Sequence, residues 1–378
     1  MNSNTPYWIW LQSALGAGAR IKEITEYFGG VKEVYDAGET QWKMSPVLVP
    51  RQVEHLKNCS LAQANDILTV CRLNSWQVIT PDDENYPRRL YEIDNPPAAL
   101  YVAGNLPDID NSVAIGIVGT RKASDYAIKA ADVMSRGIAK LGAVVVSGGA
   151  LGVDTAAHNA AILSSGKTVA VLGCGLGTNY LMENKPLRDS IAANGALVTE
   201  FQPFTKASRY TFPVRNRIIS GLSLGVLVVE AGIRSGSLIT AGYAADQGRD
   251  VYAIPCSILE PEYAGTNKLI DQGAVVATKP LDLVYPYAER YGIDVSGAKS
   301  VGAIMKETSH KTVNAKETSG ISFENLNISR EKRAERQKAA AQLSGNTLTV
   351  YRALGEDYMH VDEIAAKTSL GTGAVLTA

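Results

Sequence analysis

The sequence predicts a doubly wound α/β domain with a mainly parallel sheet, preceded by a small helical domain and followed by a partial winged-helix module. Two observations carry the central prediction. From about residue 113, short apolar runs alternate with helical segments, as in a parallel sheet covered on both faces. Most of these runs end in glycine or a small polar residue, which is typical of the turns that lead from a strand into a helix.

The first domain, residues 1–75, is predicted to be helical. Ile21, Ile24 and Phe28 recur at helical spacing, and similar patterns continue to about residue 75. Four glycines separate these helical patterns, and they are Gly16, Gly18, Gly29 and Gly30. Two interpretations stay open: a SAM-like module that only packs, or a helix-hairpin-helix whose glycine turn contacts phosphates.

The second domain, residues 76–288, begins with a proline-rich passage that cannot be one helix, because proline removes a backbone donor and restricts its predecessor. We interpret this passage, residues 80–97, as a connector. The predicted strands of the sheet follow it, and they are 113–118, 143–147, 168–172, 196–199, 225–230, 250–254 and 274–277.

Residues 289–345 are polar and predict a linker. Three short helical patterns in 346–378, with Gly371 at a turn, predict the start of a winged-helix module.

Composition narrows the function classes. Of 378 residues, 37 are Lys or Arg and 38 are Asp or Glu, so any basic site must be local. The four cysteines form no CxxC pair, which predicts neither a disulfide framework nor a metal site. We expect a cytoplasmic protein that neither crosses nor binds a membrane, because no signal sequence and no run of about 18 apolar residues occurs.

Several strand-to-helix turns are rich in glycine. They include Gly119-Thr120-Arg121, Ser147-Gly148-Gly149 and the stretch 173–178. In a parallel sheet these turns share one rim, where backbone N–H groups favour anions. Each turn alone also fits a purely steric need for glycine. Their recurrence favours a polyphosphate or a polymeric anion over a single phosphate.

The stretch 173–178 has a rival interpretation. Gly173, Gly175 and Gly177, with Glu200 after the next strand, suggest a dinucleotide site with a ribose-binding acid. The spacing is GxGxG instead of GxGxxG, so we predict no cofactor.

The segment 206–217, KASRYTFPVRNR, combines four basic residues with Tyr210 and Phe212 and contains no acid. Basic groups neutralise phosphates, and ring faces stack on bases at about 1 to 3 kcal/mol per base. This segment therefore predicts a binding site for a single strand, although a solvated basic loop is the simpler interpretation of any charge run.

Catalysis finds little support, and we predict no catalytic residue. Asp154 and His158 stand one helical turn apart, for which a packing role is favoured over general base work. The sequence has no GxSxG, HExxH or Walker A motif. An alternative enzyme of similar fold, a phosphoribohydrolase acting on nucleotides, would use Glu230 as its carboxylate.

Longer strings support a family resemblance. Residues 79–278 resemble the DNA-processing protein A (DprA/Smf) family. The strings that carry the resemblance are GIVGTR (116–121), VVSGGALGVDTAAH (145–158), FPVRNRIISGLS (212–223), VVEAGIRSGSLITAGYAADQGRDVYAIP (228–255) and GTNKLIDQGA (265–274).

The resemblance implies an extended Rossmann-like, non-enzymatic protein that binds and protects incoming single-stranded DNA and loads the RecA recombinase during natural transformation, usually as a homodimer. Carried over residue by residue, it implies a DNA site. The implied or predicted site residues are Gly119, Thr120, Arg121, Ser147, Gly148, Gly149, Lys185, Arg209, Phe212, Arg215, Asn216 and Arg217. Cys256 departs from the family pattern, which usually has glycine there.

Overall fold

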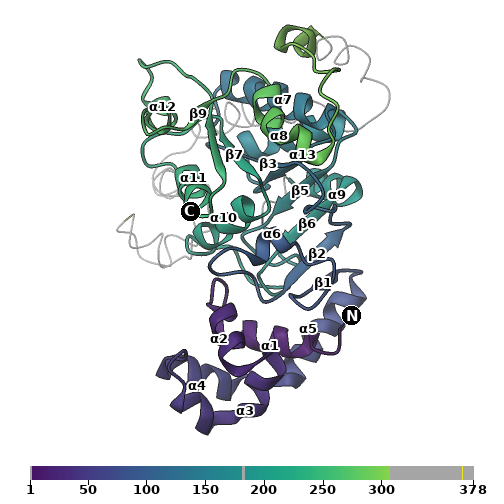
Figure 1. Ribbon diagram of the computed structural model, residues 1–378, viewed down its shortest axis with the longest axis vertical. Coiled ribbons are helices and arrows are strands. Elements are labelled where there is room, and N and C mark those ends of the chain that lie inside the picture. The colour runs from purple at the N-terminus through teal and green to yellow at the C-terminus, as the bar shows by residue number, and fades with distance from the viewer. Residues whose placement is uncertain (1, 181–183, 307–367, 369–378) are drawn as a thin grey trace. The chain divides into compact units, whose positions relative to one another are not determined.

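The computed structural model describes residues 2–180, 184–306 and 368. The chain divides into two units, Met1–Thr308 and Ser309–Ala378, and apart from Thr368 the described residues belong to the first (Figure 1). The predicted winged-helix module and most of the predicted linker lie outside the described residues.

One sheet forms the centre of the first unit and confirms the predicted doubly wound α/β class. Its strands lie in the order β1-β2-β6-β5-β4-β3-β7-β8-β9. They span β1 Gln77–Ile79, β2 Leu100–Gly104, β3 Ala114–Val118, β4 Val144–Ser147, β5 Thr168–Val171, β6 Ala196–Thr199, β7 Gly225–Val228, β8 Asp250–Ala253 and β9 Val275–Val276.

All seven predicted strands are present, shortened by up to two residues at either end, and they pair in parallel. Chain order reverses at β3, which lies between β4 and β7. A doubly wound sheet opens a crevice at the carboxyl ends of the strands where this reversal occurs.

Two strands that the sequence did not predict flank the connector. Strand β1 precedes it, β2 follows it, and each pairs antiparallel with its neighbour, β1 with β2 and β2 with β6. The prolines lie in the chain between these two strands. β1 has only three residues. β2 is an apolar run in which Leu100, Tyr101 and Val102 are buried. It closely follows Pro96 and Pro97, however, and the sequence pattern does not separate it from the proline-rich passage.

Helices cover both faces of the sheet. They span α6 Arg88–Tyr91, α7 Asp125–Lys140, α8 Val153–Leu163, α9 Lys185–Asn194, α10 Thr211–Gly221, α11 Ser237–Asp246, α12 Ala264–Asp271 and α13 Leu281–Tyr291, with a 3-10 turn η2 at Pro261–Tyr263. Successive residues of β4 show the two layers: Val144 and Val146 pack with α10 and α11, whereas Val145 packs with α7 and α8.

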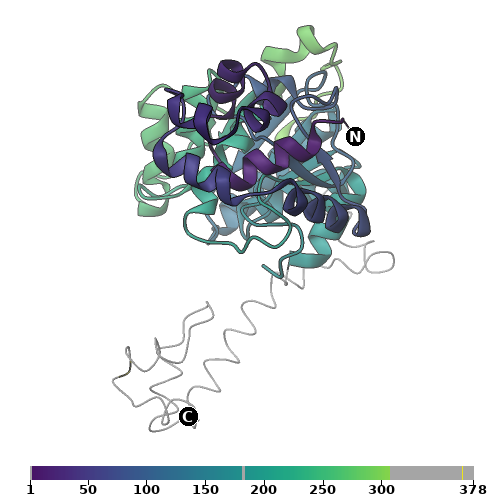
Figure 2. The same ribbon diagram turned by 90° about the horizontal axis from the view of Figure 1, so that it is seen from below.

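The region before the sheet is helical, as predicted, and its helices are α1 Thr5–Leu15, α2 Ile21–Phe28, α3 Val31–Met44, α4 Pro50–Asn58 and α5 Leu61–Leu73. Figure 2, in the view from below, shows them packed as one layer. Their core, built around Trp8, Trp10 and Trp42, also contains Tyr101 of β2. The Gln12 amide donates to the Ala99 carbonyl at 3.0 Å, so the helices and the β1–β2 edge share one interior.

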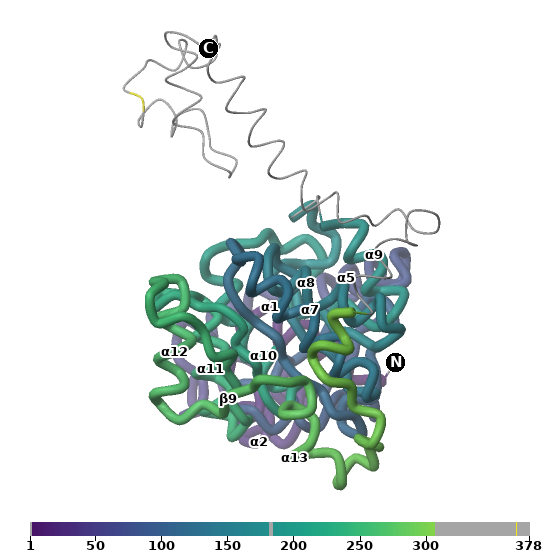
Figure 3. The backbone as a smooth tube through the Cα atoms, turned by 90° about the horizontal axis from the view of Figure 1, so that it is seen from above, coloured from purple at the N-terminus to yellow at the C-terminus, as the bar shows by residue number. Residues whose placement is uncertain are grey.

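Helix α13 packs against α7, and the chain continues beside it (Figure 3). Ile304 is buried, and its side chain lies close to Gly137 of α7. The first part of the predicted linker therefore packs on the sheet domain. Within the described residues, none of the helices has the length and apolar character required to span a bilayer.

Two left-handed glycines give a matched test of packing. Gly104 and Gly142 have φ of +90° and +85°, but only at Gly104 would a Cβ collide with backbone carbonyl oxygens, those of Ala192 and Gly195. We expect Gly142→Ala to cost about 1 to 2 kcal/mol from backbone strain alone. Gly104→Ala should cost about 3 kcal/mol or more, because the carbonyls cannot move aside. Urea unfolding of both variants measures the difference, and equal losses would contradict this account.

Candidate nucleic-acid interface

The predicted site residues come from turns at the carboxyl ends of the strands and from the beginning of α10, except for Lys185, which begins α9. We call residues 119–121, 147–149 and 209–217 together the rim. β3 and β4 lie side by side in the sheet, so the first two of these segments begin at neighbouring positions. The third segment leads into α10, which packs on one face of the sheet.

Arg121 and Arg209 are exposed, and both lie against aromatic rings at the beginning of α10. The Arg121 guanidinium carbon is 4.6 Å from the centroid of the Phe212 ring. That of Arg209 is 4.9 Å from the centroid of Tyr210, and its Nη2 donates to the Tyr210 hydroxyl at 2.7 Å. Two cations and two rings therefore gather over one helix start, with the Tyr210 side chain open to solvent.

Besides Arg121, three residues contact the Phe212 ring or lie close to it. Tyr180 packs at 5.5 Å between ring centroids, and the guanidinium carbon of Arg215 lies 5.9 Å from the Phe212 ring. At Gly173 a Cβ would approach the Phe212 ring to 2.7 Å, so a larger residue there would displace the ring. Tyr180 was not among the predicted residues, because nothing in the sequence indicates that this loop reaches α10.

The turn after β4 is buried and bonded internally. The Ser147 hydroxyl donates to the Ile117 carbonyl at 2.6 Å. The backbone N–H groups of Gly148 and Ala150 donate to one oxygen of Asp154, at 3.1 and 3.3 Å. The anion that the turn holds in this structure is therefore the carboxylate of Asp154.

Arg215 lies behind this turn. It is buried, and its Nη1 donates to the carbonyl oxygens of Gly148 and Val171. Burial lowers the pKa of Arg215, while the nearby carboxylate of Asp154 acts in the opposite direction. Burial likewise raises the pKa of Asp154, against the effect of Arg215. The two charges offset each other in an interior where neither would be tolerated alone.

The rest of the RNR sequence is also internal. Arg217 is buried, and its Nη2 pairs with Oε1 of Glu200 at 2.7 Å. The side-chain amide of Asn216 donates to the carbonyl of Gly236 at 3.3 Å. Arg215 and Arg217 point to different sides of α10 because residues two apart on a helix do not share a face. Arg215 is covered by the ends of β4 and β5, and Arg217 by Glu200 and by the turn at Gly18.

This burial changes how the segment 206–217 is understood. The sequence suggested one basic loop, whereas α10 begins at Thr211 and takes Arg215, Asn216 and Arg217 into the interior. The structure does not bring their charged or amide groups to the surface beside Arg121 and Arg209.

The remaining predicted residues lie around this centre. Gly119 and Thr120 are half-buried, and the Thr120 N–H donates to the Glu230 carbonyl at 2.9 Å. Lys185 begins α9, is exposed and pairs with Asp189 at 2.7 Å. Cys256, at the position of the family glycine, does not adopt a positive φ, so the turn requires no glycine.

The groups that the two enzymatic interpretations would use for a ligand are bonded to other parts of the protein. In the stretch 173–178, the N–H groups of Gly175 and Gly177 donate to the carbonyls of Thr205 and Pro203 at 2.9 and 2.7 Å, and Glu200 is paired with Arg217. The Glu230 carboxylate is buried and accepts from the N–H and hydroxyl of Ser124. The carboxylates that these interpretations require are therefore engaged within the protein.

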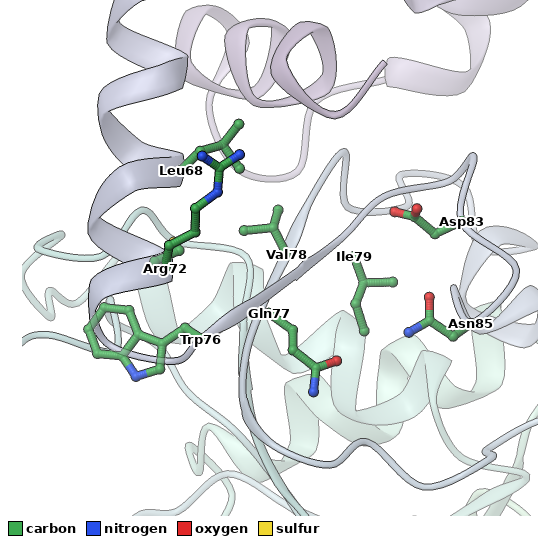
Figure 4. Close-up of a pocket in the computed structure, with 9 residues that line it drawn as sticks. Leu68, Arg72, Trp76, Gln77, Val78, Ile79, Asp83 and Asn85 are labelled. Carbon is green, nitrogen blue, oxygen red and sulfur yellow. The ribbon is translucent and has the colours of Figure 1, made fainter. Parts of the chain in front are cut away.

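A pocket of about 260 Å³ lies elsewhere, between α5 and the β1 edge (Figure 4). It is lined by Leu68, Cys71, Arg72, Trp76, Gln77, Val78, Ile79, Asp83 and Asn85. None of these residues belongs to the rim.

Comparison with known proteins places the chain in context. The profile of the family described as DNA recombination-mediator protein A matches residues 77–288, and that of the DprA winged helix domain matches residues 334–378. Protein Smf of Synechocystis sp. is 36% identical over 73% of this chain and 70% of its own length. The DNA processing protein DprA of Bacillus subtilis is 39% identical over 59% of this chain and 75% of its own length.

The solved structures that resemble this chain include two DNA processing proteins. DNA processing protein A from Streptococcus pneumoniae superposes with a TM-score of 0.65 at 34% identity, covering 74% of this chain and 97% of the other. DNA processing protein A from Helicobacter pylori, solved to examine its single-stranded DNA binding mode, gives 0.52 at 29% identity, covering 57% and 97%.

His158 is a buried helix residue behind the rim, and its Nδ1 lies 2.8 Å from the Thr168 hydroxyl. Burial, reinforced by the charge of Arg215, lowers its pKa from the ordinary 6.5 to about 3. Between these pH values the unfolded chain binds a proton that the folded protein does not, so stability falls as the pH falls.

We expect His158→Gln to remove this component of the pH dependence, which approaches about 1.4 kcal/mol per pH unit below pH 6. Free energies of unfolding of both proteins between pH 7 and pH 4 provide the measurement. Parallel curves for the wild type and the variant would show that His158 does not titrate in this way.

Proposed function

This chain belongs to the DNA recombination-mediator protein A family, and on that premise we propose that it binds single-stranded DNA at the rim, with little base specificity. Its family and its relatives named as DNA processing proteins support a role in DNA processing. The single-stranded DNA binding described for the Helicobacter pylori protein supports this choice of ligand.

One observation carries the proposal: Arg121 and Arg209, both exposed, lie against the aromatic rings at the start of α10. A single strand offers phosphates and unstacked bases together, whereas a duplex hides its bases. Guanidinium groups bind the phosphates, and a base can stack on a ring or on a guanidinium plane. The site is therefore suited to a single strand even though the chain as a whole carries a net charge of −1.

The other predicted residues take different parts in this proposal. Arg121, Arg209 and Phe212 contact DNA, and Lys185 adds a cation at its margin. Gly119, Thr120, Ser147, Gly148 and Gly149 shape the backbone over which the strand passes. Arg215, Asn216 and Arg217 hold α10 in place from the inside, because their polar groups are bonded to the protein interior.

We extend the proposal to the family's cellular role: protection of incoming DNA and loading of RecA during natural transformation, in the cytoplasm, without enzymatic activity of its own. In this arrangement, residues 76–288 form the DNA-binding domain. Residues 1–75 support it, and 289–345 connect it to the winged-helix module at 346–378.

We also propose a homodimer formed through the β9 edge of the sheet. β9 ends the strand order, and its Val275 and Val276 side chains are 51% and 43% exposed (Figure 1). Ile258 and Leu259, which precede α12, are 88% and 84% exposed. An unpaired strand edge next to exposed apolar side chains is a surface that a second copy can cover.

Titration of labelled single-stranded and duplex oligonucleotides at two salt concentrations tests the DNA-binding proposal. We expect preferential binding of the single strand. Arg121→Ala and Arg209→Ala should each weaken binding and lower the slope of log affinity against log salt by about 0.7, the value for one phosphate contact.

Arg72→Ala is the matched control, because Arg72 is exposed on α5 among residues that do not belong to the rim. It should bind like the wild type. Equal affinity for the duplex, or full affinity and slope in the Arg121 and Arg209 variants, would place the DNA elsewhere.

Sedimentation equilibrium tests the dimer. We expect Leu259→Asp/Val275→Asp to be monomeric at concentrations where the wild type is dimeric, because two desolvated carboxylates would face a second copy. Leu73→Asp changes a side chain of similar exposure, 81%, on α5 and should leave the wild-type association intact. A double variant that associates like the wild type would exclude this edge.

A further inference from the structure

The turn between α1 and α2 resolves a question that the sequence left open. Gly16 and Gly18 both have positive φ, 81° and 78°. Such a turn presents backbone N–H groups and could hold a phosphate, as in a helix-hairpin-helix. In this structure the N–H of Gly18 instead donates to Oε1 of Glu200 at 3.0 Å. The anion at the turn is a side chain of the protein.

Glu200 joins the N-terminal helices to α10. It follows β6, is 3% exposed, and its Oε1 accepts from both Gly18 and Arg217 of α10. We call Gly18, Glu200 and Arg217 the latch. A nearby hydrogen bond of 2.8 Å, from the Gln202 amide to the Ser13 hydroxyl, also joins the segment after β6 to the N-terminal helices.

The turn is also closed sterically. A Cβ at Gly18 would lie 3.3 Å from Cγ1 of Val214, so the turn rests directly on the first turns of α10. A phosphate group cannot enter between them without separating the N-terminal helices from α10. The glycine turn therefore functions as an internal contact and is not free to bind nucleic acid.

Helix α10 connects the latch to the rim. Phe212 stands two residues before Val214 and five before Arg217. The Phe212 ring fits tightly between Gly173, Tyr180 and Arg121, where small shifts of the helix would change its contacts. Anything that fixes α10 from the other side therefore also fixes the position of this ring.

We propose that Glu200 is a positioning residue for DNA binding: through the latch it fixes α10 against the N-terminal helices and so holds Phe212, together with the Arg121 guanidinium that lies on its ring, where a base can stack. The inference rests on the proposed function. It assigns the N-terminal helices a role in DNA binding without any contact to DNA.

The test compares three variants of the full chain. Glu200→Gln removes the buried charge, and Gly18→Ala disturbs the other side of the latch by its positive φ and by its approach to Val214. Arg20→Ala is the control. Arg20 is exposed in the same turn and pairs loosely with Glu23 at 3.7 Å, so it would contact phosphate if the turn were a DNA site.

Two measurements separate positioning from phosphate contact and from simple loss of folding. The first is affinity for a single strand as a function of salt. The second is the quenching of a 2-aminopurine base in the strand at saturating protein, which reports stacking for each bound strand. Loss of folded protein lowers the apparent affinity but leaves the quenching at saturation unchanged.

We expect Glu200→Gln and Gly18→Ala each to weaken binding by about tenfold, as when one base loses stacking on a ring. Quenching at saturation should decrease in both variants, whereas the salt slope should keep its wild-type value. Arg20→Ala should match the wild type in affinity, slope and quenching. If Glu200→Gln does not fold, Gly18→Ala carries the test alone.

Unchanged quenching in folded Gly18→Ala or Glu200→Gln would overturn the proposal. A slope lowered by about 0.7 in Arg20→Ala would also overturn it, because the turn would then bind phosphate. A wild-type protein that shows no preference for single strands would instead reject the proposed function, which is a separate outcome.

Discussion

The arrangement of the rim depends on two buried guanidinium groups on opposite sides of α10. Arg215 donates to the carbonyls of Gly148 and Val171 beside the carboxylate of Asp154, and Arg217 pairs with Glu200. A buried charge that loses its partner is costly, so each pair resists displacement of the helix. Because the helix start carries Phe212, these internal pairs define the surface that faces solvent.

This division explains how a chain with nearly equal numbers of acidic and basic residues can present a site for a polyanion. Of the four basic side chains in the segment 206–217, two are exposed and two are internal. In the proposed site, the exposed guanidinium groups of Arg209 and Arg121 are the ones that would bind phosphates, while Arg215 and Arg217 are bonded to the interior. Each of these two exposed guanidinium groups lies over an aromatic ring, so the proposed site combines charge with surfaces on which bases could stack.

The N-terminal helices are packed and hydrogen-bonded to the sheet domain that carries the rim. Their tryptophan core includes Tyr101 of the sheet edge, and their glycine turn holds the carboxylate of Glu200. A turn with the features of a phosphate-binding hairpin thus serves the interior. The backbone N–H of such a turn can bind an anion, and in this fold the anion is the carboxylate of Glu200.

The sequence by itself determined the class of the fold and the seven parallel strands, because periodicity and local composition reflect burial on both faces of a sheet. Arg121 and Arg209, which the family resemblance and the basic segment single out, are exposed in the structure. Tertiary structure decided the strands β1 and β2, the packing of Tyr180 against Phe212 and the burial of Arg215 and Arg217. Whether a charged helical residue faces water or the interior depends on partners distant in sequence, such as Glu200 for Arg217 and Gly148 for Arg215. No local pattern encodes those partners, because they meet only when the sheet, α10 and the N-terminal helices pack together.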